Sequence, residues 1–340
     1  MTPILVTGGA GFIGSHTCKA LRASGFDPIS YDSLDRGNPE AVQWGALEIG
    51  TLADGARLRE VLTRYRPAAV VHFAALAYVG ESNADPLLYY RNNVGGTAAL
   101  LDAMHDCGVG KMVLSSSCAV YGAPAVVPIG EDARLAPVNP YGATKMFCEQ
   151  ILKDCAAAFA LNFIALRYFN AAGADPGGNI GECHVPETHA IPLLLDTAAG
   201  GREFTIFGDD YPTPDGTCVR DYVHVTDLAD AHVRALRALL DGADNSALNL
   251  GIGRGWSLRE LIATVREVTG RDVAVQSGPR RPGDPPILVA DPARAREKLG
   301  WRPVYCELAT QVSHAWAWRR GGANTWQRMR DSKETGFKPI

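Results

Sequence analysis

The chain has 340 residues, of which 46% are hydrophobic and 21% are charged. Its 33 Lys and Arg residues stand against 37 Asp and Glu residues, so the formal net charge is −4. This composition predicts a folded α/β protein of about two domains and argues against a disordered chain. The slight acidic excess excludes the basic face with which proteins bind a nucleic-acid backbone, so we expect no nucleic-acid partner.

The eight cysteines are scattered and form no Cys-x-x-Cys pair. Residues 1–6 lack the basic stretch and the long apolar run of a secretion signal. No segment reaches the ~20 apolar residues that cross a bilayer. We therefore expect a reduced, cytoplasmic protein that has no membrane partner.

Apolar, β-forming runs alternate with helical patterns through the first half of the chain. The expected strands are residues 4–6, 28–32, 68–73, 111–115 and 163–167. Strands this apolar suit a parallel sheet that helices cover on both faces. The predicted fold class is therefore α/β, a doubly wound parallel sheet of the Rossmann type, with a smaller α/β C-terminal substrate domain.

Beyond about residue 170 the chain becomes rich in loops. Gly, Pro and His gather at residues 173–192, and further turn-rich loops follow at 208–216 and 280–286. Long loops in compact enzymes are usually functional. We expect a nucleotide-binding domain at 1–170, to which some later segments return, a substrate domain at 171–320 and a tail at 321–340.

A glycine-rich turn, Thr-Gly-Gly-Ala-Gly-Phe-Ile-Gly, follows the first expected strand and opens a helix. Gly8 permits the tight turn, Gly11 lets the backbone approach a pyrophosphate, and Gly14 lets helix and strand pack closely. The helix N-terminus offers unpaired N–H groups to the phosphates. Asp32 closes the second expected strand, where a carboxylate binds the ribose hydroxyls of the adenosine and repels a 2′-phosphate. The predicted cofactor is therefore NAD.

Tyr141 and Lys145 stand four residues apart, directly after Pro140, which suits the first turn of a helix. A phenol with a pKa near 10 is a poor base at neutral pH, but a nearby ammonium and a cationic nicotinamide favour the phenolate. The serines at 115–117 end an expected strand, where a hydroxyl can hydrogen-bond the substrate oxygen whose proton the phenolate takes. A Tyr-x-x-x-Lys spacing alone is common by chance. The glycine turn upstream supports the interpretation of Tyr141 and Lys145 as a catalytic pair.

Together these elements resemble the extended short-chain dehydrogenase/reductase family and, within it, the UDP-glucose 4-epimerases. Matching segments lie at residues 73–82, 115–122, 139–142, 166–170 and 207–213, and the most specific one runs from 215 to 232. The resemblance implies an NAD-dependent isomerase of galactose metabolism. It would interconvert UDP-glucose and UDP-galactose by transient oxidation at C4. It also implies a homodimer whose contact surfaces lie around residues 86–107 and 141–159.

The resemblance assigns roles to individual residues. Tyr141 is the implied acid and base at O4 of the hexose, Lys145 holds the nicotinamide ribose and tunes Tyr141, and Ser117 bonds the same hydroxyl. Besides these three, the implied cofactor contacts are Gly8, Gly11, Phe12, Ile13, Gly14, Asp32, Ser33, Thr51, Leu52, Phe73, Ala74, Ala75, Ala77, Asn92 and Phe169.

The implied UDP-sugar contacts lie mostly beyond residue 170. Arg220 and Arg281 are the implied diphosphate clamps, because a guanidinium matches phosphate geometry. Besides Ser117 and Tyr141, the implied substrate contacts are Asn170, His189, Ala190, Thr205, Ile206, Phe207, Arg220, Arg281, Asp284 and Leu288.

The chain departs from the family pattern at several of these positions. Ala77 stands where a lysine often lies, and Thr51 stands where an aspartate often meets the adenine amine, although its hydroxyl can still accept a hydrogen bond. Leu288 occupies the position whose size governs the room for a 2-acetamido group. Its intermediate bulk leaves UDP-N-acetylhexosamines open as substrates, and UDP-pentoses also remain an alternative.

The chain lacks the acid/base residues that other reactions of the same superfamily require. A nucleotide-sugar 4,6-dehydratase needs an Asp-Glu pair where this chain has Cys118 and Ala119, and decarboxylases generally carry a glutamate at the Ala119 position. A non-catalytic NAD-binding scaffold is the alternative from another class, but such proteins typically lose the tyrosine or the lysine.

Cys183, His184 and His189 are candidate ligands of a metal centre. Their spacing matches no recognisable zinc pattern, and a loop histidine that contacts substrate is the preferred interpretation, so the sequence predicts no metal site.

Overall fold

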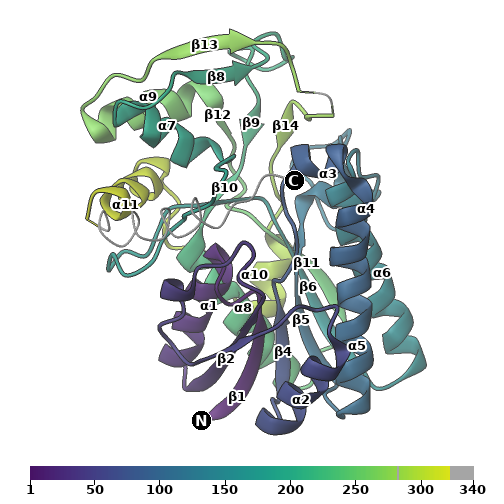
Figure 1. Cartoon of the computed structure of the whole chain (residues 1–340). Helices are drawn as coiled ribbons and strands as arrows, with labels where there is room; N and C mark the ends of the chain where they lie inside the picture. Colours follow the sequence, from purple (N-terminus) through teal and green to yellow (C-terminus); the bar gives the residue numbers. More distant parts are fainter. Residues whose placement is uncertain (282, 322–340) are drawn as a thin grey trace.

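A parallel sheet of seven strands forms the centre of the larger body (Figure 1). The structure is a computed structural model and describes residues 1–281 and 283–321. The strand order is β11-β6-β5-β4-β1-β2-β3, and every neighbouring pair is parallel. The strands are β1 (Thr2–Thr7), β2 (Phe26–Asp32), β3 (Ala46–Ile49), β4 (Ala69–His72), β5 (Lys111–Ser117), β6 (Asn162–Tyr168) and β11 (Ser246–Leu250).

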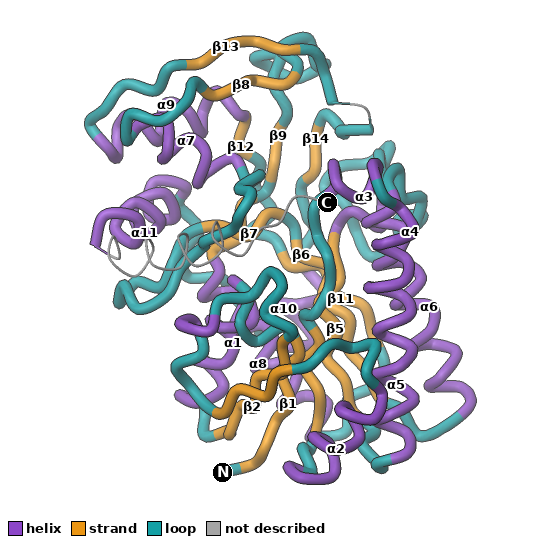
Figure 2. The backbone as a smooth tube through the Cα atoms, in the orientation of Figure 1, coloured by secondary structure: helices purple, strands orange, loops and turns teal. Residues whose placement is uncertain are grey.

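Helices cover both faces of this sheet. One face carries α1 (Phe12–Ala23) and α8 (Val225–Leu240), and the other carries α2 (Gly55–Tyr65), α5 (Gly96–Asp106) and α6 (Pro140–Ala158) (Figures 1 and 2). Side chains alternate between the two faces along a strand. Ile4 and Val6 accordingly enter one apolar core while Leu5 enters the other, and all three are fully buried. The predicted doubly wound parallel fold is confirmed.

The second body lies at the carboxyl end of the sheet. It contains α7 (Ala190–Ala198), α9 (Leu258–Thr269) and α11 (Leu308–Gly321) packed on one apolar core. Its strands form two small sheets: β8 (Phe204–Phe207) pairs with β13 (Val275–Gly278), and β9 (Val219–Arg220) lies between β12 (Trp256–Ser257) and β14 (Ile287–Leu288). The strands β7 (Asn170–Ala172) and β10 (Tyr222–His224) pair with each other.

Shorter elements connect these parts. They are η1 (Pro39–Ala41), α3 (Val79–Ala84), α4 (Pro86–Tyr89), η2 (Tyr90–Gly95), η3 (Cys118–Tyr121) and α10 (Ala293–Leu299). In the described part of the chain, no helix combines the length and apolar character that a bilayer span requires.

Segments from beyond residue 170 take part in the large sheet. β11 pairs with β6, and α8 packs against α1. The division into 1–170 and 171–320 stays a prediction. Gly321 ends α11, and the rest of the predicted tail, 322–340, lies outside the described residues.

Local sequence signals explain where two important helices begin. The Asn139 Oδ1 accepts a hydrogen bond of 2.8 Å from the Gly142 N–H, and Pro140 follows as the first residue of α6, as predicted. Ser257 caps α9 and forms a reciprocal capping box with Glu260. The Asn139 cap holds the first turns of α6, which carry Tyr141 and Lys145.

Candidate active site

The carboxyl ends of four neighbouring strands bring the predicted cofactor residues to one edge of the sheet. The glycine turn follows β1, Asp32 ends β2, Phe73 to Ala75 follow β4, and Ser117 ends β5. In doubly wound sheets this edge is where ligands bind.

The glycine turn leaves room for a phosphate and no room for side chains beneath it. A Cβ on Gly8 would lie 2.6 Å from the Ala74 N, and one on Gly14 would lie 2.1 Å from the Gly8 O. A Cβ on Gly11 would meet only the Gly8 O, at 3.2 Å, among the described residues. Gly11 is the N-cap of α1 and has no side chain with which to occupy the first N–H groups. The turn therefore fits the pyrophosphate of a dinucleotide.

Asp32 is fixed at the rim of this turn. Its Oδ2 accepts from the Ala10 N–H at 3.0 Å and its Oδ1 from the Leu34 N–H at 2.9 Å. Each carboxylate oxygen has a second lone pair with which to accept a ribose hydroxyl. This arrangement fits the adenosine end of NAD.

Ser33 and Thr51, the further residues predicted to contact the adenosine, form hydrogen bonds with residues of this chain. The Ser33 hydroxyl donates to Asp35 at 2.9 Å. The Thr51 hydroxyl accepts a long bond of 3.4 Å from the Ala53 N–H, while its carbonyl accepts from the Tyr31 hydroxyl at 2.9 Å. The Thr51 hydroxyl therefore keeps acceptor capacity, and its contact with adenine stays a prediction.

Tyr141 and Lys145 both lie on the buried face of α6, with exposures of 8% and 4%. The Lys145 Nζ donates to the Ser115 carbonyl at 2.8 Å, which fixes the ammonium at the end of β5. The Ser117 side chain hydrogen-bonds the Tyr141 phenol and accepts from the Ala119 N–H at 3.2 Å. The structure therefore brings the three predicted catalytic residues together.

Burial dominates the electrostatics of this trio. It raises the pKa of the Tyr141 phenol above its ordinary value, while the hydrogen bond from Ser117 acts in the opposite direction. Burial also lowers the pKa of Lys145. Sequence reasoning expected the ammonium to favour the phenolate, and in these surroundings desolvation acts in the opposite direction. Added positive charge from a bound cofactor would act against the desolvation.

Asn93 is a site residue that sequence reasoning missed. Its Nδ2 donates to the Leu76 carbonyl and to the Thr144 hydroxyl, both at 3.0 Å, and its Oδ1 accepts from the Leu76 N–H at 2.8 Å. This buried amide joins the segment after β4 to the catalytic helix. Asn92, the predicted contact, is half-buried and donates to the Asn93 Oδ1 at 2.9 Å. The sequence signal that could have identified Asn93 was the pair of polar amides, Asn92 and Asn93, within an otherwise helical segment.

Three of the predicted substrate residues meet around β9. Arg220 is buried, and its guanidinium forms an ion pair with Asp284 and donates to the Val219 carbonyl at 2.8 Å. Leu288 in β14 is the register partner of Arg220 in β9. Asp284 therefore orients Arg220, in addition to any contact of its own with substrate.

A second group of predicted substrate residues lies near β8. The Arg281 guanidinium stacks 4.0 Å from the centroid of the Phe207 ring. Ile206 is only 2% exposed and packs in the apolar core of the second body. Any contact of Ile206 with substrate would therefore involve its backbone.

The remaining predicted positions lie in the segments that link the two bodies. Asn170 begins β7, where its N–H donates to the Asp221 carbonyl at 2.9 Å. His189 is the N-cap of α7, and Ala190 is that helix's first residue. The roles of all these residues toward a substrate stay predictions.

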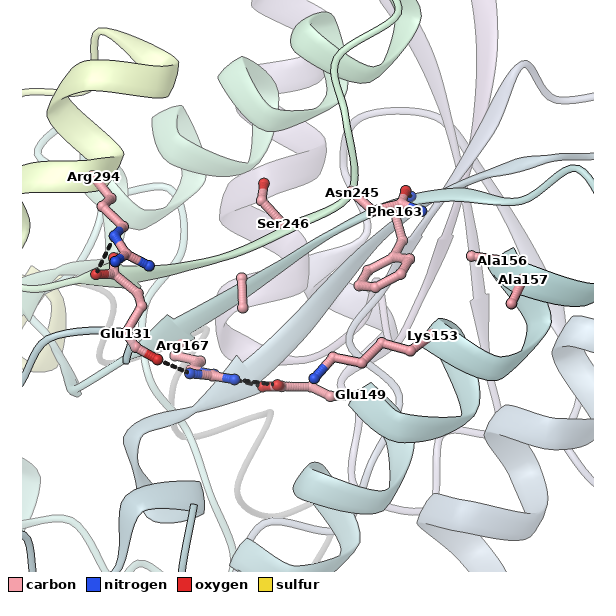
Figure 3. A pocket seen from close by; sticks show the side chains of 11 residues that line it. Glu131, Glu149, Lys153, Ala156, Ala157, Phe163, Arg167, Asn245, Ser246 and Arg294 are labelled. Atoms are coloured by element: carbon pink, nitrogen blue, oxygen red, sulfur yellow. Dashed lines mark hydrogen bonds and ion pairs between the residues drawn. The ribbon is translucent and has the colours of Figure 1, made fainter. Parts of the chain in front are cut away.

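A separate pocket of about 540 Å³ lies between α6, β6 and β11 (Figure 3). Arg167 projects into it between Glu149 and Glu131, whose carbonyl accepts from the Arg167 Nη1 at 3.3 Å. The side chains that line it include none of the predicted cofactor or substrate residues. This pocket is therefore distinct from the candidate active site.

Comparison with known proteins agrees with this geometry. Residues 4–251 match the NAD dependent epimerase/dehydratase family. A UDP-glucose 4-epimerase from Rhizobium meliloti (strain 1021) is 54% identical over 316 residues, which cover 93% of this chain and 96% of that protein.

Two solved structures share the whole architecture. The UDP-glucose 4-epimerase from Brucella ovis, solved in complex with NAD, has 53% sequence identity and a TM-score of 0.91, and the match covers 93% of this chain and 98% of that one. A UDP-glucose-4-epimerase from Stenotrophomonas maltophila, with bound NAD and formylated UDP-arabinopyranose, has 40% identity and a TM-score of 0.92. That match covers 96% of this chain and 100% of the other.

Proposed function

Because this chain belongs to the NAD dependent epimerase/dehydratase family and, within it, to the UDP-glucose 4-epimerases, we propose that it interconverts UDP-glucose and UDP-galactose. One observation carries this proposal. Ser117, Tyr141 and Lys145 are buried together at the edge of the sheet where the glycine turn also lies. Bound NAD supplies the reversible acceptor for the hydrogen at C4 of the sugar.

The chain's own residues move the accompanying proton. Tyr141 takes the proton of the C4 hydroxyl when that carbon is oxidised and returns it when the carbon is reduced from the opposite face. Ser117 hydrogen-bonds the same oxygen and the phenol, so the proton has a fixed path. Burial of all three side chains keeps water from the reacting carbon.

The UDP moiety is bound by the second body. Arg220 and Arg281 offer guanidinium groups to the diphosphate, and the Asp284 carboxylate holds Arg220 in place. Phe207, already stacked with Arg281, offers an apolar face beside them. Because these residues bind the nucleotide and not the hexose, the hexose can rotate and present either face to the cofactor.

A coupled assay tests the proposal. The purified protein, supplied with NAD and no reductant, should convert each of the two hexoses to the other. Absence of conversion in both directions would contradict the proposal. UDP-pentoses and UDP-N-acetylhexosamines, tested in the same assay, decide between the hexose and the alternative substrates.

We also infer that the protein is a homodimer joined through the face formed by α4, α5 and α6. Leu87 is 64% exposed and Phe147 is 43% exposed on this face, and the Phe147 ring lies 6.1 Å from the Tyr90 ring. Apolar side chains in such positions are typical of subunit contacts. Light scattering should give twice the 36.3 kDa chain mass, and Phe147→Asp should shift the population to monomer.

A cytoplasmic role in galactose metabolism completes the proposal. The eight cysteines all lie within the described residues and form no disulfide with one another, as is typical of a reducing compartment. Fractionation of cells that express the protein should place it in the cytoplasm.

A further inference from the structure

Four metal-ligating side chains from one short segment converge in front of α7. They are Glu182, His184, Glu187 and His189, and one ligand atom from each lies within 4.8 Å of all the others. The His189 Nδ1 lies 2.7 Å from the Glu182 Oε1 and 3.0 Å from the Glu187 Oε1. The His184 Nδ1 lies 3.1 Å from the Glu182 Oε1 and 3.7 Å from the Glu187 Oε2.

We propose that this histidine–glutamate cluster binds one zinc ion through two imidazole nitrogens and two carboxylate oxygens. Zn²⁺ accepts these ligand types at 2.0–2.2 Å in a tetrahedral arrangement, which places neighbouring ligand atoms about 3.4 Å apart. The nitrogen–oxygen separations of 2.7 to 3.7 Å, which involve both oxygens of Glu187, bracket that value. One ligand atom from each residue lies within 4.8 Å of the others, so modest side-chain shifts would complete the shell. With both imidazoles neutral the four ligands carry two negative charges, which one divalent ion neutralises.

The ligands are held by their surroundings. The Glu187 Oε1 accepts from the backbone N–H groups of Thr188 at 2.7 Å and His189 at 2.8 Å. The His184 ring packs edge-on against the rings of Phe12 and Tyr78, with centroid distances of 6.4 and 6.0 Å. Outer contacts of this kind orient metal ligands and strengthen binding.

One side of the cluster is open to solvent. The His189 side chain is 43% exposed, whereas that of Glu182 is 8% exposed. An ion can therefore enter past His189 and be bound against the buried carboxylate.

The candidate ligands that the sequence offers are Cys183, His184 and His189, and they do not include Glu182 or Glu187. Cys183 lies between the two ligands Glu182 and His184 but belongs to a small apolar core with Ile180 and Trp318. The loop folds back instead, so that Glu182 and Glu187 supply the oxygens. The expected absence of a metal site rested on the spacing of Cys183, His184 and His189, which matches no recognisable zinc pattern.

A bound ion would stiffen a segment that already contacts the body formed by the large sheet. His184 packs on Phe12 at the start of α1, and the Asn38 Nδ2 donates to the Cys183 carbonyl at 3.2 Å. Zinc would thus fix the 182–189 segment against the cofactor-binding turn. Because an ion that binds the folded state alone stabilises it, the melting temperature should rise with zinc concentration.

Metal binding to the full-length protein tests the proposal directly. After dialysis against chelator, titration with Zn²⁺ should show one saturable ion per chain, and Co²⁺ should give the intense visible bands of a tetrahedral nitrogen–oxygen site. Thiolate-to-cobalt charge-transfer bands should be absent. Their presence would assign the ion to cysteine, and weak octahedral bands or no saturation would also overturn the proposal.

Single variants locate the ion. His184→Ala and Glu187→Gln should each weaken Zn²⁺ binding at least tenfold and abolish the rise in melting temperature. His105→Ala changes an exposed histidine on α5 and should leave both readouts unchanged. Glu182→Gln provides a near-isosteric second test if His184→Ala fails to fold. Unchanged Zn²⁺ affinity in the folded cluster variants would refute the site.

Discussion

Arg167 of β6 and Glu149 of α6 form a two-point ion pair behind the catalytic residues. The Arg167 Nε lies 2.9 Å from the Glu149 Oε1 and the Nη2 lies 2.5 Å from the Oε2, with side-chain exposures of only 4% and 1%. The Ser116 hydroxyl donates to the same carboxylate at 2.6 Å, and the Tyr121 hydroxyl accepts from Arg167 at 2.8 Å. Glu149 stands one helical turn beyond Lys145, so the pair secures the catalytic helix to the sheet.

Arg167→Met should destabilise the fold strongly, because it leaves the Glu149 carboxylate buried without its partner. The expected loss is about 3–5 kcal/mol in the free energy of unfolding, measured with urea. Asp102→Ala removes an exposed ion pair with Arg59 and should cost no more than about 1 kcal/mol. Replacing both buried partners with apolar residues should recover much of the loss. A double variant no more stable than Arg167→Met would contradict this account.

Tyr141→Phe should abolish most turnover and preserve substrate affinity. Removing the hydroxyl deletes the proton acceptor at O4, so kcat should fall about 10²–10⁴-fold. Binding of UDP, measured by calorimetry, should be nearly unchanged. Tyr65→Phe removes a hydroxyl from α2 that donates to Glu48 at 2.6 Å, and it should leave kcat unaltered. Equal activity of the two variants would remove Tyr141 from the mechanism.

His72 should make the stability fall as the pH falls. Burial between the hydroxyls of Thr7 and Thr97 lowers the pKa of His72 from 6.5 to about 3. Between these values the unfolded chain binds a proton that the folded chain does not. The contribution of His72 to the free energy of unfolding is therefore full above pH 6.5. It is lost as the pH falls towards 3, at up to about 1.4 kcal/mol per pH unit.

The His72→Gln variant isolates this contribution, since all other titrating groups are shared with the unaltered protein. Urea unfolding at pH 7.5, 5.5 and 4.5 should show the largest stability difference between the two proteins at the highest pH. A difference that is constant across this range would show that His72 does not titrate as described.

Gly14→Ala should impair both folding and NAD binding. The added Cβ would lie 2.1 Å from the Gly8 carbonyl, so the turn that faces the pyrophosphate must shift. Gly80→Ala is the matched control, because a Cβ there meets no described heavy atom within 4 Å. Equilibrium titration with NAD should show at least tenfold weaker binding for Gly14→Ala alone. Equal NAD affinities would show that the turn tolerates the side chain.

Leu288→Tyr should narrow the range of UDP-sugars that the protein accepts as substrates. Leu288 is 8% exposed and packs beside Phe169 and Cys118 near the catalytic trio. A larger ring at this position should reduce any activity on UDP-N-acetylhexosamines more than activity on UDP-hexoses. The ratio of kcat/KM values measures this effect, and equal losses on both sugars would reject the role.

Much of the fold and of the cofactor site was predictable because the signals are local. Apolar runs identified β1, β2, β4, β5 and β6, and turn chemistry located the phosphate-binding helix start. β3 was missed because it is a short edge strand, Ala46–Ile49, with only one fully buried residue and therefore little apolar pattern. The three predicted catalytic residues were proposed from residue types at the ends of a strand and a helix, and the structure brings them together.

Only the tertiary structure joined residues that are distant along the chain. Nothing in the sequence around Arg220 indicates that Asp284 pairs with it, and nothing around Leu76 indicates that the Asn93 amide holds it against α6. The raised pKa of Tyr141 likewise depends on burial by several elements at once. Helix starts, turns and strand faces are determined by neighbouring residues, whereas desolvation and ion pairing are determined by what the folded chain brings within a few ångströms.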